Sequence, residues 1–278
     1  MRSSLKKQVI YRIENLTGRK ALLRLTRGVE EEFEDCQNFW KVMCGRFNVT
    51  INVFNATPQT MTAIPKTGPV LIVVNHPNGV LDGLVIGQLL QSVRPDFKIL
   101  AQSVFMQVDA LAPNILPVSF GETDDATKIN LQTRKDAINH LKDDGCICVF
   151  PAGGVSTSLT PFGKAKDTRW RNFTAKLLAV PDVQVVPIYI AGQNSRLFQI
   201  VSHISDTLRK AMLLYEFKRR LGSAVQIAVG QPLQLSDWDA DNGDPVALMQ
   251  YLYQQTYGLA PLQAHDDGYG FEFDKRYR

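Results

Sequence analysis

The chain has 278 residues, of which 45% are hydrophobic and 21% are charged, and its formal net charge is +4. This composition is typical of a globular protein with one or two domains and excludes a disordered chain. No apolar run approaches the roughly 20 residues that span a bilayer. The first residues are followed by charge instead of an apolar stretch, which argues against a secretory signal. We therefore expect a protein that is not integral to a membrane.

The four cysteines predict neither a disulfide framework nor a zinc site. Cys36, Cys44, Cys146 and Cys148 lack the spacing of zinc ligands. Cys146 and Cys148 lie two residues apart in an apolar run, so we expect them to be buried on one face of a strand. A reducing, cytoplasmic compartment fits this cysteine content best, and we expect no metal site.

Residues 1–45 are predicted to form a basic, amphipathic helical segment. Eight lysines and arginines precede residue 29, against the single acid Glu14. Four apolar residues stand at helical spacing, namely Leu5, Val9, Ile13 and Leu16. Such a helix is typical of a membrane surface, where basic side chains meet anionic head groups. The alternative is a basic, solvated face packed on the protein's own core. Nucleic-acid binding is disfavoured because aromatic residues do not alternate with the basic ones.

Residues 46–235 are predicted to form one α/β domain, with a mostly parallel central sheet flanked by helices. The apolar run at 70–74 suits a strand that is buried on both faces. The alternating pattern at 47–53 suits a half-buried strand. Further strands alternate with helices, which is typical of this fold class. The strands are expected at 97–101, 115–118, 146–150, 183–190 and 225–229, and the helices at 83–90, 130–141 and 205–221.

Residues 236–278 are predicted to contain one helix, at 245–257, and a polar, aromatic tail. We expect this tail to be peripheral. Two histidines outside the motifs below, His140 and His203, have no partner at the spacing of metal ligands. We assign both to structural roles.

The first candidate site is the segment Asn-His-Pro-Asn-Gly-Val-Leu-Asp-Gly at 75–83, between a predicted buried strand and a predicted helix. Ligands bind at the carboxyl ends of strands in open parallel sheets. If Asp82 accepts from one ring nitrogen of His76, the other nitrogen is free to take a proton. This is a catalytic triad without its serine, so the substrate's own hydroxyl would act as the nucleophile. A lone histidine near an aspartate is more often structural, and the position after a strand favours catalysis.

The second candidate site is the glycine pair Gly153-Gly154, which follows the predicted strand at 146–150. Glycines let backbone amides approach a ligand closely, so this turn can hold an oxyanion or an anionic head group. The alternative is a tight loop that needs positive φ. The residues alone favour the tight loop.

These blocks resemble the signatures of the glycerolipid or lysophospholipid acyltransferase family. In that family four residues separate the His and the Asp of the first block, whereas five separate His76 and Asp82. The expanded form is similar to His-Pro-x-Gly-x-x-Asp-Gly of a bacterial branch labelled hemolysin-like. Members of that branch are linked to O-acylation of amino-acid lipids such as ornithine and glycine lipids.

Further blocks carry the same resemblance in the family's order, from about residue 69 to 232. Phe-Pro-Ala-Gly-Gly-Val-Ser at 150–156 stands where the family has Phe-Pro-Glu-Gly-Thr-Arg-Ser, and Val-Pro-Ile at 186–188 fits the last block. The segments at 166–170, 191–199 and 208–211 resemble the hemolysin-type branch in particular.

The resemblance implies His76 and Asp82 as the catalytic pair and also a set of substrate-binding residues. Those residues are Asn78, Gly79, Lys98, Phe150, Pro151, Gly153, Gly154, Ser156, Asp167, Arg169, Trp170 and Arg196. Trp170 belongs either to the substrate wall or to the core. The family's Glu and Arg, which serve glycerol-phosphate acceptors, are replaced by Ala152 and Val155. Loss of an arginine removes a bidentate phosphate partner, which argues against lysophosphatidate as the acceptor. Other cations remain candidates for that role, namely Lys98, Lys164, Lys166, Arg169, Arg171 and Arg196.

We expect an O-acyltransferase that moves a fatty acyl group from acyl-CoA or acyl-ACP, as co-substrate and with no cofactor, to the hydroxyl of a lyso-lipid. The preferred acceptor is a lyso-amino-acid lipid, and lysophosphatidate is the alternative. Backbone amides at 78–79 or 153–154 would stabilise the oxyanion. The expected location is peripheral, at the lipid surface on the cytoplasmic face of the inner membrane. A serine lipid hydrolase is disfavoured because the chain has no Gly-x-Ser-x-Gly elbow. A non-catalytic, membrane-binding protein is disfavoured by the intact His76-Asp82 pair.

Overall fold

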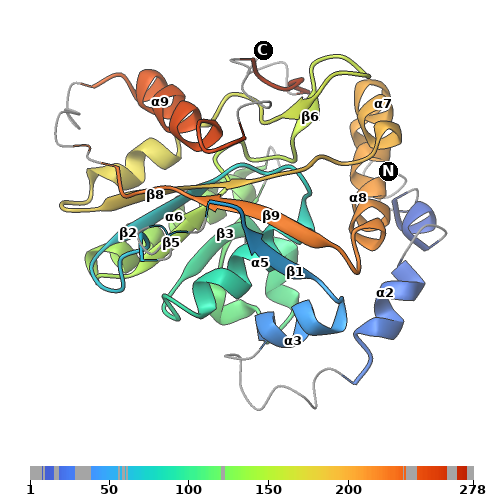
Figure 1. Ribbon diagram of the computed structural model, residues 1–278, viewed down its shortest axis with the longest axis horizontal. Coiled ribbons are helices and arrows are strands. Elements are labelled where there is room, and N and C mark those ends of the chain that lie inside the picture. Colours follow the sequence, from blue (N-terminus) through green and yellow to red (C-terminus); the bar gives the residue numbers. More distant parts are fainter. Residues whose placement is uncertain are drawn as a thin grey trace.

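A seven-stranded β-sheet forms the centre of the molecule in the computed structural model (Figure 1). The structure describes residues 8, 10–15, 19–28, 39–55, 57, 60, 62–119, 123–233, 235, 243–261 and 268–273. The strand order is β1-β9-β8-β2-β5-β3-β4, and β1 and β9 run opposite to the other five strands. The strands are β1 (Thr50–Val53), β2 (Val70–Val74), β3 (Lys98–Gln102), β4 (Ile115–Val118), β5 (Cys146–Val149), β8 (Gln184–Ile190) and β9 (Ala224–Val229). This architecture confirms the predicted mostly parallel α/β fold.

Helices cover both faces of the sheet. α3 (Phe39–Arg46) and α5 (Val80–Gln91) pack on one face, and α6 (Asp124–Lys142) and α9 (Pro245–Tyr257) pack on the other. α7 (Arg196–Ile204), α8 (Asp206–Arg219) and α2 (Arg19–Leu25) follow one another along one side of the molecule (Figure 1). None of the helices that the described residues form has the length and apolar content of a bilayer-spanning segment. The 3₁₀ turns are η3 (Ser103–Gln107), η4 (Ala112–Asn114) and η5 (Thr174–Ala179), and a small hairpin joins β6 (Thr157–Ser158) to β7 (Ala165–Lys166).

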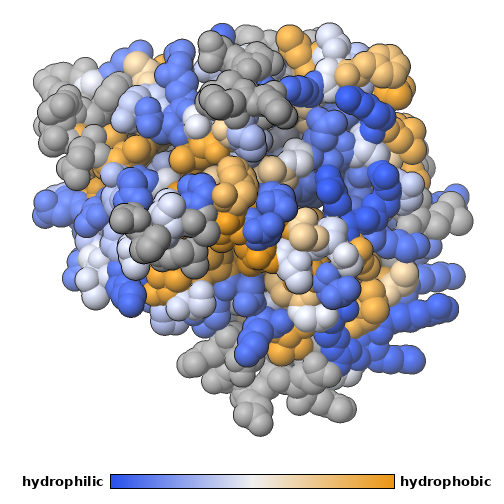
Figure 2. Space-filling model, viewed as in Figure 1, coloured by the Kyte–Doolittle hydropathy of each residue, from blue (hydrophilic) through white to orange (hydrophobic). Residues whose placement is uncertain are grey.

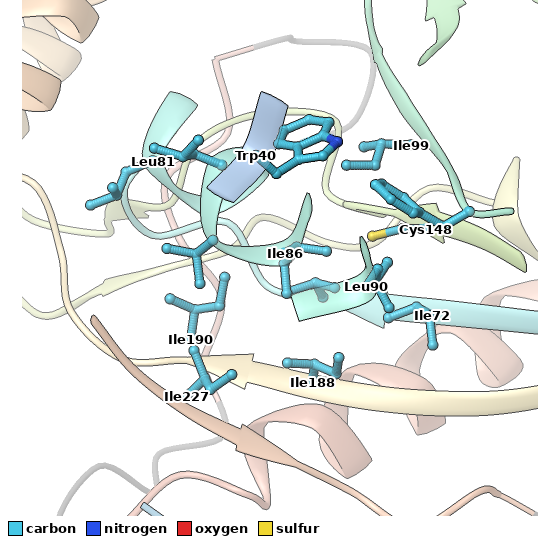
Figure 3. Packing of buried hydrophobic residues seen from close by; sticks show 14 of the residues in the cluster. Trp40, Ile72, Leu81, Ile86, Leu90, Ile99, Cys148, Ile188, Ile190 and Ile227 are labelled. Carbon is cyan, nitrogen blue, oxygen red and sulfur yellow. The ribbon is translucent and has the colours of Figure 1, made fainter. Parts of the chain in front are cut away.

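The continuous apolar run of β2 is explained by the two hydrophobic cores that it separates. Val70, Ile72 and Val74 point into the core under α3 and α5, which Figure 3 shows from close by. Leu71 and Val73 point into the core under α6 and α9. The neighbouring strand β5 follows the same alternation, because Cys146 and Cys148 face the first core while Ile147 and Val149 face the second. The prediction that both cysteines are buried on one face is confirmed.

A buried arginine fixes the amino-terminal edge of the parallel strands. Arg94 donates to Pro65 O (3.1 Å) and Gly68 O (3.0 Å) in the loop before β2, and to Asp144 O (2.7 Å) in the turn before β5. Its ion pair with Asp96 (2.7 Å) lowers the pKa of that carboxyl. The predicted structural role of His140 agrees with this arrangement, because its Nε2 lies 2.8 Å from Asp96 O. The loops at the opposite, carboxyl-terminal edge are therefore the ones available for a site.

Several elements differ from those that the sequence predicts. α5 and α6 begin three and six residues earlier than expected, and α7 and the β6–β7 hairpin were not predicted. At the N-terminus, Leu5, Val9, Leu16 and Cys36 lie outside the described residues. In the described part of that segment, Leu22 on α2 is buried, and α2 lies against α8.

The expectation of a peripheral C-terminal tail was wrong. Gly270 N donates to Asp167 O (2.8 Å) and Phe271 N to Thr157 O (3.3 Å), so the described part of the tail, at 268–273, lies along the β6–β7 hairpin. A Cβ atom on Gly270 would come within 2.1 Å of Lys166 O, so only glycine fits this contact. The prediction failed because this glycine contacts a hairpin that the sequence did not reveal.

Two glycines of α5 give opposite expectations for stability. Gly87 allows the Trp40 ring on α3 to touch the helix backbone, and an added Cβ would lie 2.1 Å from that ring. We expect Gly87→Ala to destabilise the fold by about 1–3 kcal/mol through overpacking. Gly83 has nothing within 4 Å of its added Cβ, so Gly83→Ala should stabilise the helix by about 0.5–1 kcal/mol. Denaturant unfolding measures both, and equal effects would contradict the packing of α3 on α5.

Candidate active site

Three loops meet at the carboxyl-terminal edge of the sheet, after β2, β5 and β8. Asn75, directly after β2, donates from Nδ2 to Ile190 O (2.9 Å) and accepts from Ile190 N (2.6 Å). His76 O accepts from Ser156 N (2.8 Å), which ties the first loop to the loop after β5. The register of the parallel strands thus brings together blocks that are about 80 and 115 residues apart in the sequence.

His76 and Asp82 form a hydrogen-bonded pair at this edge. His76 Nδ1 lies 2.9 Å from Asp82 Oδ2, the aspartate is fully buried and the histidine side chain is 19% exposed. Asp82 also accepts from Asn78 N (2.8 Å), Gly79 N (3.0 Å) and Asn78 Nδ2 (2.9 Å). These donors fix the carboxylate, and the carboxylate fixes the imidazole. His76 Nε2 has no hydrogen-bond partner among the described residues, so it is the nitrogen that can take a proton.

The turn between His76 and Asp82 depends on glycine at position 79. Gly79 has φ of 74°, and an added Cβ would lie 3.3 Å from a methyl group of Val155. The chain then enters α5, whose first turn holds Asp82. A carboxylate in this position is favoured by the helix dipole. The five-residue separation that the sequence shows therefore still allows direct contact between imidazole and carboxylate.

Phe150 covers one side of the histidine. The two ring centroids are 4.3 Å apart with an interplanar angle of 31°. Phe150 therefore lies beside His76 and packs against one face of its imidazole. Pro151 follows it and is buried, and its carbonyl accepts from Arg171 N (2.8 Å).

A second buried carboxylate, Asp167, supports the backbone of the site. It accepts from Ser156 Oγ (2.5 Å), Trp170 Nε1 (3.0 Å) and His76 N (3.1 Å). Burial raises the pKa of Asp167, and the hydrogen bonds from Ser156, Trp170 and His76 lower it. Tyr257 OH on α9 accepts from Asp167 N (2.8 Å). The structure thus brings Asp167, Ser156 and Trp170 to the site. They form a buried, hydrogen-bonded frame behind His76.

The backbone amides that the sequence predicts for an oxyanion are mostly occupied. The amides of Asn78 and Gly79 donate to Asp82, and the Gly153 amide donates to Phe150 O (3.0 Å). Gly153 has φ of 67°, as the tight-loop alternative expected. Of the four amides, only that of Gly154 has no acceptor among the described residues. The expectation for residues 78–79 was therefore wrong, because their amides hold the carboxylate.

Three predicted basic residues are not brought to His76. Lys98 pairs with Ile147 and is level with Leu71, five residues before His76, which places it roughly 15 Å down the sheet. Arg196 is exposed and donates to Gly163 O (2.5 Å) at the β6–β7 turn. Arg169 is exposed, with its guanidinium 5.5 Å from the Tyr269 ring centroid. The predicted substrate wall also loses Trp170, whose ring packs in the core near Tyr253.

Two residues of this region were missed as site residues. Asn75 lies inside a block that the resemblance marks, so a signal existed for it. Tyr257 lies on α9, and no sequence pattern connects it to Asp167. Among the described residues, no group of three or more His, Cys, Asp or Glu side chains could hold a metal ion.

Two buried serines provide a matched test of the frame. Ser156→Ala removes a donor to the buried Asp167 carboxylate, and we expect a loss of about 1–3 kcal/mol in unfolding free energy. Ser202 on α7 is equally buried, but its Oγ has no hydrogen-bond partner among the described residues. Ser202→Ala should therefore be neutral or slightly stabilising. Denaturant titrations of both variants check this, and an unchanged stability of Ser156→Ala would contradict the frame.

Comparison with known proteins places this site in a family. The profile of the family described as Acyltransferase matches residues 17–263. A lyso-glycine lipid O-acyltransferase of Phocaeicola vulgatus is 25% identical over 206 residues, which cover 70% of each chain. A protein of the same name from Bacteroides thetaiotaomicron is 25% identical over 210 residues, or 70% of this chain and 72% of that one. The crystal structure of the 1-acyl-sn-glycerophosphate acyltransferase PlsC from Thermotoga maritima matches with a TM-score of 0.49 at 16% identity, covering 95% of this chain and 98% of that one. With the family profile spanning most of its length, the chain belongs to the acyltransferase family.

Proposed function

We propose that this acyltransferase moves a fatty acyl group from a thioester donor to the hydroxyl of a lyso-lipid, and that its preferred acceptor is a lyso-amino-acid lipid. The observation that carries the chemistry is the His76–Asp82 pair, in which Nδ1 is held at 2.9 Å and Nε2 is left for a substrate proton. The names of the two relatives, both lyso-glycine lipid O-acyltransferases, support the acceptor class.

In the proposed mechanism His76 Nε2 takes the proton of the acceptor hydroxyl as the oxygen attacks the thioester carbonyl. Asp82 stabilises the imidazolium that forms. The Gly154 amide, which has no acceptor among the described residues, would stabilise the oxyanion of the tetrahedral intermediate. When the intermediate collapses, the C–S bond breaks and His76 returns the proton to the thiolate. The products are the ester and the free thiol, and no acyl-enzyme is required.

The residues inside the block at 150–156 support an acceptor other than a phosphate lipid. Ala152 and Val155 occupy the positions of the family's Glu and Arg, and both are buried. Val155 packs with Phe198 and Met212 in a small apolar cluster. A phosphate would find no arginine at position 155 to bind in a bidentate manner. Lysophosphatidate remains the alternative acceptor that the assay below includes.

The geometry of Ser156 argues against a serine hydrolase. Its hydroxyl donates to Asp167 at 2.5 Å, and no described histidine side chain contacts it. Asp167 is an acceptor already shared by three donors. A serine whose proton is bound by a buried carboxylate in this way has no imidazole to activate it.

The membrane surface, the donor and the location belong to the same proposal. On α2, Leu23 and Leu25 are exposed beside Arg19, Lys20 and Arg24. Exposed leucines flanked by basic side chains suit the head-group region of an anionic bilayer. We therefore infer a peripheral enzyme at the cytoplasmic face of the inner membrane, with acyl-CoA or acyl-ACP as co-substrate and no cofactor.

Lipid mass spectrometry of expressing cells tests the proposal. We expect an O-acylated aminolipid only when the chain is expressed beside an N-acyltransferase that supplies the lyso-lipid. His76→Ala should reduce that product by about 10³-fold or more, because it removes the base. The melting temperature should stay close to wild type, since the His76 side chain is partly exposed.

His140→Gln is the matched control, because this histidine bonds Asp96 O at the opposite edge of the sheet. It should leave acyl transfer within about threefold of wild type. Near-normal product from His76→Ala would refute the role of His76. Phosphatidate as the only new lipid would refute the aminolipid acceptor.

A further inference from the structure

Arg209, on the first turns of α8, reaches the glycine turn of the site from the side opposite to His76. Its Nη2 donates to Val155 O and to Thr157 Oγ1 (3.1 Å). Val155 O and Ser156 N belong to one planar peptide, whose N–H and C=O point in opposite directions. Ser156 N donates to His76 O (2.8 Å). The backbone oxygen of His76 and Arg209 Nη2 are therefore at most about 8 Å apart.

Among the described residues, no acid forms an ion pair with Arg209. Phe198 and Phe273 flank its guanidinium, with ring centroids 5.8 and 5.3 Å from Cζ. Two acids act on its charge from a greater distance, and both pair with other cations, Asp206 with Lys210 (2.6 Å) and Glu272 with Arg171 (2.7 Å).

One donor of Arg209 also remains unused. Its Nε is buried and has no hydrogen-bond partner among the described residues. Polar groups in such surroundings are normally paired, because leaving them unpaired is costly. An anionic acceptor of hydrogen bonds would satisfy this donor.

We propose that Arg209 binds the carboxylate of the acceptor's amino-acid head group. This inference rests on the proposed function and deepens it. An amino acid that is acylated on its nitrogen keeps its carboxylate, and a guanidinium is the side chain best suited to bind one. Gly154 leaves the approach open, since even a Cβ at this position would stay 4.0 Å from Arg209 Nη2. The head group would then be held on one side of the Gly154 turn and the hydroxyl on the side of His76.

Steady-state kinetics with two acceptors test this role. One acceptor is a lyso-lipid with a glycine carboxylate, and the other is its carboxamide analogue. For Arg209→Gln, which keeps a donor for Val155 O, we expect KM for the carboxylate acceptor to rise 10- to 100-fold with kcat within threefold. KM for the carboxamide should not change. Arg209→Lys, which keeps the charge, should give a smaller rise, and Lys218→Gln is the control for an exposed charge on the same helix.

If Arg209→Gln raised KM equally for the carboxylate and the carboxamide acceptor, Arg209 would only support the turn. That result would overturn the carboxylate anchor but leave the proposed function intact. Wild-type protein that acylates lysophosphatidate but neither glycine acceptor would overturn the proposed function and the carboxylate anchor with it. The two failures are therefore distinguishable.

A separate observation concerns an exposed apolar face next to the site. The three most exposed large hydrophobic side chains of the described residues are Phe162 (76%), Ile204 (72%) and Leu159 (65%). Leu159 and Phe162 lie in the β6–β7 turn, and Ile204 ends α7. Leu197, Val201 and Ile204 share one side of α7 by their spacing. Figure 2 shows apolar side chains at the upper right of the molecule, where Figure 1 places α7 and this turn.

The two elements of this face are joined rigidly. His203 Nε2 donates to Ser158 O (3.0 Å), and both N and Oγ of Ser158 donate to the Gln199 side chain. Leu159, the first residue of the face, lies three residues after Ser156, so the face follows closely on the Gly153-Gly154 turn of the site. Exposed basic residues surround it, namely Lys164, Arg196 and Lys210.

We infer that this face, formed by Leu159, Phe162, Leu197 and Ile204, inserts into an anionic lipid bilayer. The basic rim matches acidic head groups, and apolar side chains of this kind enter the acyl boundary. A second copy of the chain fits less well, because two like-charged rims would meet. Insertion at this point would bring the catalytic turn to the level at which a lyso-lipid head group lies.

Co-sedimentation with phosphatidylglycerol and phosphatidylethanolamine vesicles tests the face. We expect the double variant Phe162→Asp/Ile204→Asp to lower the partition coefficient at least tenfold. Val246→Asp changes a residue on α9 that is 54% exposed, and it should leave binding unchanged. Equal binding by the double variant would overturn the inference. So would a wild-type dimer that the double variant dissociates while its vesicle binding persists.

Discussion

The carboxylate of Asp82 determines the geometry on which the site depends. A buried carboxylate is costly unless donors replace its hydration. Here Asn78 supplies two donors, Gly79 one and His76 one. The same bonds that satisfy the acid therefore set the shape of the turn and the orientation of the imidazole. A role in orienting the base and a role in folding the loop cannot be separated in this arrangement.

Asp167 secures the same turn from its main-chain side. Its carboxylate accepts from His76 N and Ser156 Oγ, while its backbone contacts Tyr257 and Gly270. The C-terminal helix and the segment at 268–273 are thereby connected to the backbone of His76. Two buried acids thus divide the task, since Asp82 orients the ring and Asp167 holds the peptide that carries it. This explains why residues that are about 190 positions apart in the sequence belong to one structural unit.

Much of the fold follows from local patterns, while the composition of the site follows only in part. The apolar run of β2 and its position before His76 are sufficient to place the base at the carboxyl edge of a parallel sheet. The sequence could not exclude Lys98 from the site, because the position of Lys98 along the sheet depends on the register of β3 against β5. The amides of Asn78 and Gly79 looked suited to an oxyanion because the sequence does not show that Asp82 turns back on them. Gly270 and Tyr257 are joined to Asp167 only by long-range packing, which leaves no periodic signal.

The balance of charge at this edge of the sheet sets Arg209 apart from the buried acids. Each of the buried carboxylates Asp82 and Asp167 accepts hydrogen bonds from three residues. Glu216 likewise accepts from Ser195 N (2.9 Å) and Ser195 Oγ (2.5 Å). Arg209 differs, because aromatic rings and two neutral oxygens surround its charge. The family's arginine is lost at position 155, and a cation reaches the same peptide from α8 instead. A cation displaced in this way would hold an anion from the side of α8 instead of from the glycine turn itself.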